Sequence, residues 1–233
     1  MTAENNQKNL KLNPRLAKIA ELLPNCRSVA DIGTDHAYIP IYALLKGKAE
    51  YAIASDINRG PVERAGKNAR LFGLEDRLSL RLGPGLETLS AGDAEVIVIA
   101  GMGGILISEI LENSKAVALS AKYLVLQPMP AAKELREYLC KNNFAIESEA
   151  LVAEEDKLYN ILCVRPGGKS EYTEKELILG KGLEKADPQL YRRHFAGIER
   201  KLKIRLSGLE SSDLPQNQEM ANEVRGQIEL INN

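Results

Sequence analysis

Three carboxylates and a glycine near the start of the chain have the types and spacing of a site for a nucleotide-like ligand. Asp31 and Asp35 flank Gly33 directly after one apolar run, and Asp56 closes a second apolar run 23 residues after the glycine. A glycine at such a turn lets a ligand approach the backbone, and carboxylates hydrogen-bond hydroxyl or ammonium groups. Nucleotide sites in α/β folds place the acid that binds the ribose hydroxyls about 20 residues after the glycine turn. The pattern therefore predicts that both turns line one cofactor site.

The first turn favours a cofactor with an amino-acid end over a dinucleotide. A dinucleotide fingerprint needs small residues so that a pyrophosphate can lie against the helix N-terminus. Here Asp35 occupies the place of the second glycine, and no third glycine follows. A carboxylate repels a pyrophosphate but suits an ammonium group. The turn thus favours S-adenosylmethionine over NAD; the alternative is an ordinary strand-to-helix connection with a chance acid.

Length and composition limit the remaining possibilities. The chain has 233 residues, 44% of them hydrophobic, without an apolar run near the length of a membrane span, so we expect one sizeable α/β domain and a small appendage. Residues 1–9 are polar and lack a signal-peptide core, which predicts a cytoplasmic protein. Cys26, Cys140 and Cys163 lie far apart, so we expect reduced, buried thiols and no metal site.

Strand and helix patterns alternate along the first two thirds of the chain. A basic amphipathic helix begins at Pro14. Strands are expected over residues 28–32, 51–56, 78–82, 94–100 and 123–126, helices over residues 39–46, 61–72, 105–111 and 131–141, and a terminal hairpin over residues 144–152 and 158–164. This order predicts a mostly parallel, doubly wound α/β sheet whose ligand edge lies at the carboxyl ends of the strands.

Beyond residue 168 the pattern becomes helical. Apolar residues recur at steps of three and four from Tyr191 to Leu209 and again from Met220 to Ile231. We expect an antiparallel helical hairpin, or coiled coil, joined by the turn 211–215 and preceded by a short helix over residues 173–183. The predicted domains are therefore 1–168 and 169–233.

Basic residues are concentrated in two segments. Residues 185–205 contain seven basic and two acidic side chains, and residues 8–18 contain four basic and no acidic ones. One basic arm on a thin hairpin is typical of a polyanion clamp, whereas a dimerising or merely solvated coiled coil is the alternative. The phosphate contacts that we expect are Arg15, Arg192, Arg193 and Arg200.

The turn after the fourth strand indicates which atom accepts the methyl group. Enzymes that methylate exocyclic amines of bases place an Asn or Asp, two prolines and an aromatic residue there. This chain has Ala100-Gly101-Met102-Gly103-Gly104 instead, without a polar side chain to accept from an amine. A ring nitrogen with its own lone pair needs no such acceptor and is therefore favoured.

Four segments resemble a known family, the bacterial tRNA adenine-N1 methyltransferases that act on adenine 22 in the D-arm. They are residues 31–38, 100–104, 126–129 and 154–159, and the likeness covers nearly the whole chain. The resemblance implies an S-adenosylmethionine-dependent enzyme with a Rossmann-like domain and a C-terminal coiled coil that helps to hold tRNA. We expect a monomer or weak dimer. The chain departs from the family at Gly83-Pro84-Gly85-Leu86, where members usually have Gly-Asp-Gly-Leu near the cofactor adenine.

The motifs and the resemblance together give a candidate site. The expected cofactor-binding residues are Asp31, Gly33, Thr34, Asp56, Ile57, Gly83, Gly85, Ala100, Gly101 and Met102. The expected substrate-binding residues are Gly103, Gly104, Gln127 and Met129, together with the four arginines above.

Asp35 and His36 are the candidates for catalysis. Methylation makes the adenine ring cationic, so a carboxylate facing N1 and the N6 amine stabilises the growing charge and can take the N6 proton. Asp35 is assigned this role, and His36 orients it or the base. The alternatives are that Asp35 binds only the cofactor and that His36 only packs or caps a helix.

Three other functions remain open at this stage. A methyltransferase of a different RNA base or of a small molecule would use the same sheet, but the small-molecule enzyme has no need of the basic arm. A non-catalytic RNA-binding or dimerising protein would bind RNA without saturable binding of the cofactor.

Overall fold

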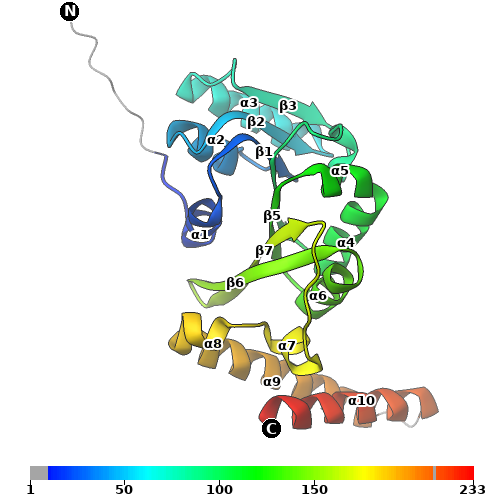
Figure 1. Cartoon of the computed structure of the whole chain (residues 1–233). Coiled ribbons are helices and arrows are strands. Elements are labelled where there is room, and N and C mark those ends of the chain that lie inside the picture. The colour runs from blue at the N-terminus through cyan, green and yellow to red at the C-terminus, as the bar shows by residue number, and fades with distance from the viewer. Residues whose placement is uncertain (1–9, 212–213) are drawn as a thin grey trace, which may run out of the picture.

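The predicted doubly wound sheet is confirmed in the computed structural model, which describes residues 10–211 and 214–233 (Figure 1). Its seven strands follow the order β3-β2-β1-β4-β5-β7-β6, in which β7 alone runs antiparallel to both of its neighbours. The strands are β1 (Cys26–Ile32), β2 (Ala49–Asp56), β3 (Leu78–Leu82), β4 (Val96–Met102), β5 (Tyr123–Pro128), β6 (Phe144–Glu154) and β7 (Lys157–Pro166). The strand order reverses between β1 and β4, and ligands of such sheets bind at that point, beyond the carboxyl ends of the strands.

Helices cover both faces of the sheet. The helices of this part of the chain are α1 (Pro14–Leu22), α2 (Tyr38–Leu45), α3 (Arg59–Phe72), α4 (Gly104–Asn113), α5 (Lys115–Ser120) and α6 (Ala132–Lys141), with a 3-10 helix η1 (Gly85–Thr88) after β3. Side chains of α1, α2 and α3 share one buried cluster with the sheet, and those of α4, α5 and α6 share the other. The near-continuous apolar strands are explained by this burial on both faces.

Several local expectations differ from the structure. The sequence patterns predict neither helix α5 nor η1, and β4 extends through Met102 because that residue pairs with Pro128 at the end of β5. The turn expected before residue 61 is already helical from Arg59, since a proline in the first turn of a helix removes no hydrogen bond. The thiols are free, but only that of Cys163 is buried.

The C-terminal part forms the expected helical hairpin, with an earlier segment that differs. Helices α9 (Pro188–Glu210) and α10 (Pro215–Asn232) lie antiparallel (Figure 1). The helix predicted over residues 173–183 is instead two short ones, α7 (Glu174–Leu179) and α8 (Leu183–Ala186), because Gly180 and Gly182 adopt φ angles of +89° and +75°. The polar start 1–9, with Lys8, and the turn residues Ser212 and Asp213 lie outside the described residues.

The apolar side chains of the hairpin pack against the neighbouring helix α7. Tyr191 and Phe195 of α9 pack against Ile178 and Leu179 of α7 and Ile231 of α10. No residue of α9 itself is fully buried.

In residues 10–211 and 214–233, no helix has both the length and the hydrophobicity to cross a membrane.

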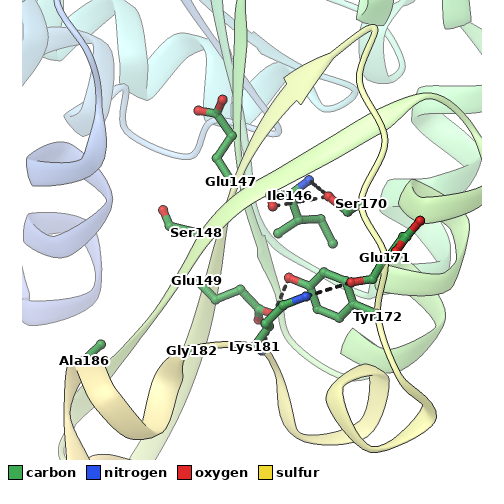
Figure 2. A pocket seen from close by; sticks show the side chains of 10 residues that line it. All are labelled: Ile146, Glu147, Ser148, Glu149, Ser170, Glu171, Tyr172, Lys181, Gly182 and Ala186. Atoms are coloured by element: carbon green, nitrogen blue, oxygen red, sulfur yellow. Dashed lines mark hydrogen bonds between the residues drawn. The ribbon is translucent and has the colours of Figure 1, made fainter.

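A buried ion pair between α6 and β6 also contacts the C-terminal segment. Figure 2 shows its carboxylate, Glu149, beside Tyr172 and Lys181. Arg136 of α6 contacts Glu149 of β6 at 2.7 Å, and their side chains are 1% and 0% exposed. The Glu149 carboxylate also accepts from the Tyr172 hydroxyl at 3.1 Å and from the Lys181 backbone N–H at 3.0 Å, while Arg136 donates to the Leu177 carbonyl at 2.9 Å. The segment from Tyr172 through α7 to Lys181 is therefore held against α6 and β6. A pocket of about 440 Å³ at this junction contains none of the predicted site residues.

Candidate cofactor and substrate site

A pocket of about 250 Å³ opens at the predicted edge of the sheet, beside the point where the strand order reverses. Five of the expected cofactor-binding residues line it: Gly33, Asp56, Ile57, Gly85 and Met102. Its other lining residues are Pro84, Leu86, Glu87, Leu106, Glu109, Ile110, Asn113 and Ser114. The pocket thus combines apolar walls suited to a purine with a carboxylate at the end of β2 suited to ribose hydroxyls.

The turn after β1 is shaped by Gly33 and Thr34. Gly33 has a φ of +76°, and the N–H groups of Gly33 and Thr34 both donate to the Ser55 carbonyl at 2.8 Å. The Thr34 hydroxyl accepts from the Ala37 N–H at 3.1 Å. These bonds fix the turn against β2, so Asp31 and Asp56 lie at one edge as the sequence predicts.

Asp31 is the buried carboxylate of the site. It is 8% exposed, and burial raises its pKa from 3.8 to about 6. A hydrogen bond from Thr34 and the positive charge of Arg15 lower the pKa, and the negative charge of Asp56 raises it further. Such a group is ionised at neutral pH but is held with less solvation than a surface carboxylate, which favours a cationic ligand.

Asp35 points toward α3, a contact that the sequence did not predict. Arg64 donates to Asp35 Oδ1 through Nε at 3.0 Å and through a second N–H, and His36 Nε2 lies 3.3 Å from Asp35 Oδ2. His36 also stacks on Tyr38, with ring centroids 5.0 Å apart. The Asp35 side chain is 63% exposed and does not line the pocket. Arg64 is one of several exposed basic residues of α3, so its sequence position carries no distinguishing signal.

The glycine-rich turn after β4 has two different parts. The Met102 side chain lies over the first turn, because a Cβ placed on Gly33 would be 2.0 Å from Met102 Cε. Gly104 is buried, and a Cβ there would be 1.9 Å from the Ala131 carbonyl oxygen. Gly103 has room, since its nearest neighbour would be Pro130 Cγ at 3.8 Å. Gly104 therefore has a packing role, whereas Gly103 can face a ligand.

Arg15 lies at the ends of β4 and β5. Its Nη1 donates to Gln127 Oε1 at 2.9 Å, and its guanidinium carbon is 5.5 Å from the Tyr159 ring centroid. Glu154 accepts from the Arg15 backbone N–H at 3.0 Å. Gln127 is fully buried and donates its amide to the Pro128 carbonyl at 2.9 Å. The sequence places Glu154 and Tyr159 in the family-like segment 154–159 but predicts no role for them.

The remaining predicted residues are spread over the molecule. Gly83, Thr34, Ala100 and Gly101 border the sheet edge without lining the pocket, and Met129 is 47% exposed beside it. Arg192, Arg193 and Arg200 are exposed on α9 and are not brought to the pocket. Within the part of the chain that the structure describes, no group of three or more His, Cys, Asp or Glu side chains could hold a metal ion.

Comparison with known proteins decides the family. A family model described as a methyltransferase domain matches residues 12–162. The tRNA (adenine(22)-N(1))-methyltransferase of Bacillus subtilis is 43% identical over 160 residues, which are 69% of this chain and 67% of the relative. The chain belongs to the tRNA (adenine(22)-N(1))-methyltransferase family.

Solved structures extend this family likeness to the C-terminal helices. The crystal structure of the B. subtilis m1A22 tRNA methyltransferase TrmK matches with a TM-score of 0.88 at 34% identity, covering 96% of this chain and 98% of that one. The crystal structure of Streptococcus pneumoniae Sp1610, described as "a putative tRNA (m1A22) methyltransferase, in complex with S-adenosyl-L-methionine", matches with a TM-score of 0.76 at 30% identity, covering 93% of this chain and 98% of that one. In this tRNA (adenine(22)-N(1))-methyltransferase family, both the sheet and the helical hairpin are therefore shared.

Proposed function

We propose that this chain transfers a methyl group from S-adenosyl-L-methionine to N1 of adenine 22 in the D-arm of tRNA. The observation that carries the proposal is the likeness to the B. subtilis m1A22 enzyme over both the sheet and the hairpin. The pocket supports it, because Ile57, Leu106 and Ile110 offer apolar contact and Asp56 offers a carboxylate. A cytoplasmic location and a monomeric or weakly dimeric state stay predictions.

In the proposed mechanism, the main role of the protein is to align the reactants. S-adenosylmethionine supplies an electrophilic methyl group on a sulfonium. N1 of neutral adenine carries a lone pair at pH 7, so no base is needed to create the nucleophile, and alignment of bound reactants can supply roughly 7 to 11 kcal/mol. Adenine 22 must leave its place in the folded tRNA, at a cost of a few kcal/mol that contacts along the RNA can offset.

Direct mapping of the product tests the proposal. We expect an unmodified tRNA transcript incubated with protein and S-adenosylmethionine to gain one methyl group, located at N1 of adenine 22 by mass spectrometry. A transcript with guanine at position 22 is the matched control and should remain unmethylated. Methylation at another nucleotide would support the rival RNA substrate, and saturable cofactor binding without transfer to tRNA would favour a small-molecule enzyme.

Asp35 is the proposed catalytic carboxylate, and its replacement should lower turnover. In the Asp35→Ala variant, we expect the methylation rate to fall about 100-fold, within the usual range for a lost general base, with unchanged affinity for S-adenosylhomocysteine. Single-turnover kinetics and calorimetry measure the two quantities. Glu63→Ala is the control, since Glu63 is another exposed carboxylate, on α3. An undiminished rate in Asp35→Ala rejects the catalytic role.

The three exposed arginines of α9 are proposed to contact tRNA phosphates. Replacing Arg192, Arg193 and Arg200 by glutamine should weaken tRNA binding and reduce the salt slope of the affinity by about one for each lost contact. The control replaces three other exposed basic residues in the same way, Lys46 directly after α2 and Lys67 and Arg70 of α3. Equal effects of the two triple variants on tRNA affinity would contradict a specific clamp on α9.

A further inference from the structure

Another pocket lies in the C-terminal part, where α8 packs against the start of α9 (Figure 1). It encloses about 210 Å³ and is lined by Glu184 of α8 and by Pro188, Tyr191, Arg192 and Phe195 of α9. The α9 residues have the i, i+3, i+4, i+7 spacing of a single helix face. The pocket shares no residue with the candidate cofactor pocket, so it is a separate feature of the molecule.

This pocket has an aromatic floor and a charged rim. Tyr191 and Phe195 lie one helical turn apart and are half-buried, because they also pack against the apolar cluster of α7 and α10. Glu184 and Arg192 are exposed. Aromatic side chains at a basic protein surface are platforms on which unpaired RNA bases stack. The floor is therefore suited to the flat face of a base.

The polar groups of the pocket are free to bind a ligand. In residues 10–211 and 214–233, the side chains of Glu184, Tyr191 and Arg192 make no hydrogen bond or ion pair. Burial, and then the negative charge of Glu184, raise the pKa of Tyr191, so its hydroxyl stays protonated and can donate. The rim thus offers one acceptor group and two donor groups around the rings.

A carboxylate at this position does not suit a phosphate. Glu184 directly precedes the segment 185–205, in which basic side chains outnumber acidic ones by seven to two. A carboxylate repels the phosphates that these basic residues attract, but it accepts hydrogen bonds from the N–H groups of bases. Guanine presents two adjacent donors, N1–H and the 2-amino group, on the edge by which proteins recognise unpaired RNA bases. Adenine, cytosine and uracil each have an acceptor beside their donor on that edge, so Glu184 favours guanine.

We propose that this pocket binds an unpaired guanine of the tRNA substrate, stacked on Tyr191 and Phe195, with Glu184 accepting from N1–H and the 2-amino group. Arg192 keeps its proposed phosphate contact, which belongs to the same nucleotide. This inference rests on the proposed function, because the RNA is the same tRNA. The pocket selects the RNA and takes no part in the transfer of the methyl group.

Replacing Glu184 by glutamine separates base recognition from charge, because it keeps the size of the side chain and removes its negative charge. Electrostatics alone predicts that the variant binds a polyanion more tightly. We expect it instead to bind an unmodified tRNA transcript about fivefold or more weakly in filter-binding titrations, the usual effect of losing a bidentate contact to a base. Glu219→Gln is the matched control, since Glu219 is an exposed carboxylate of α10 outside the pocket. The proposal is overturned if Glu184→Gln binds tRNA as tightly as the wild type or more tightly.

Chemical footprinting identifies the base. Kethoxal reacts with N1 and the 2-amino group of unpaired guanines, which are the atoms assigned to Glu184. We expect one guanine to be protected by the wild type and by Glu219→Gln but to react in the complex with Glu184→Gln. Identical footprints with all three proteins overturn the proposal. Inosine at the protected position lacks the 2-amino group and should weaken binding to the wild type but not to Glu184→Gln; equal weakening also overturns it.

The methylation assay distinguishes this inference from the proposed function. A footprint that depends on Glu184, on a protein that does not methylate adenine 22, supports the guanine pocket and rejects the proposed reaction. Methylation of adenine 22 without such a footprint supports the reaction and rejects the pocket. If the wild-type protein binds no tRNA, both fail.

Discussion

Replacing Glu149 by alanine is expected to lower the free energy of unfolding by about 3 to 5 kcal/mol, because it leaves the Arg136 charge buried without a partner. Both side chains are essentially inaccessible to solvent, and Glu149 also accepts from Tyr172 and from the Lys181 backbone (Figure 2). Urea unfolding followed by far-ultraviolet circular dichroism measures the loss.

A neighbouring ion pair, whose carboxylate lies on the same strand β6, is the matched control for Glu149. Glu147 pairs with Arg165 at 2.6 Å, with side chains 35% and 64% exposed. Exposed pairs contribute only about 0 to 1 kcal/mol, so Glu147→Ala should change stability little. Similar losses in Glu147→Ala and Glu149→Ala would contradict the special role of the buried pair.

A double replacement distinguishes the loss of stability caused by an unpaired buried charge from the loss caused by missing contacts. In Arg136→Met with Glu149→Met no buried charge is left unpaired, and such substitutions in other proteins are often neutral. We expect the double variant to be more stable than Glu149→Ala. The Tyr172, Leu177 and Lys181 contacts are lost with the pair, so tRNA affinity should fall in both variants while affinity for S-adenosylhomocysteine is retained. This result would show that the pair fixes the hairpin relative to the sheet.

The edge of the sheet at which the candidate cofactor pocket lies could be predicted, because parallel strands place their carboxyl ends at one edge. Asp31 and Asp56 follow two apolar runs, and this alone brings them to adjacent strand ends once β1 and β2 pair. Gly33 signals a turn in the sequence, and its φ of +76° is the conformation that favours glycine. Local patterns therefore place these residues at one edge without knowledge of their long-range contacts.

The partners of the site residues could not be predicted because they come from distant parts of the chain. Arg64 reaches Asp35 across 29 positions, and Arg15 reaches Gln127 across 112. Neither pairing produces a periodic or compositional pattern in the sequence. The sequence therefore does not show that Arg64 or Arg15 has a side-chain partner within the protein. The Arg136–Glu149 pair is equally hidden, since both residues belong to amphipathic segments in which charge normally indicates a solvated face.

The second large effect is expected at Gly104, which follows Gly103 directly after β4. The sequence predicts that both glycines bind the substrate, but the structure gives them different surroundings. An added Cβ on Gly104 would be 1.9 Å from the Ala131 carbonyl oxygen and 3.2 Å from Leu135 Cβ. The carbonyl belongs to the backbone and cannot rotate away as a side chain can. Gly104→Ala should therefore cost about 1 to 3 kcal/mol of stability, the range for overpacking, as measured by urea unfolding.

The same substitution should also reduce activity more than its effect on stability implies. The turns after β4 and β5 are joined by bonds from Gly104 N–H to the Pro130 carbonyl at 2.9 Å and from Met129 N–H to the Met102 carbonyl at 2.7 Å. Forcing them apart moves the turns that are proposed to bind the base, and a displacement of about 1 Å can reduce a rate about 100-fold. Gly103→Ala is the control, because Gly103 has an extended backbone with φ of −65° and an open Cβ position. Its stability should equal that of the wild type, so any loss of methylation in Gly103→Ala reports contact with the substrate, whereas a Gly104→Ala protein as stable as the wild type would refute the packing role.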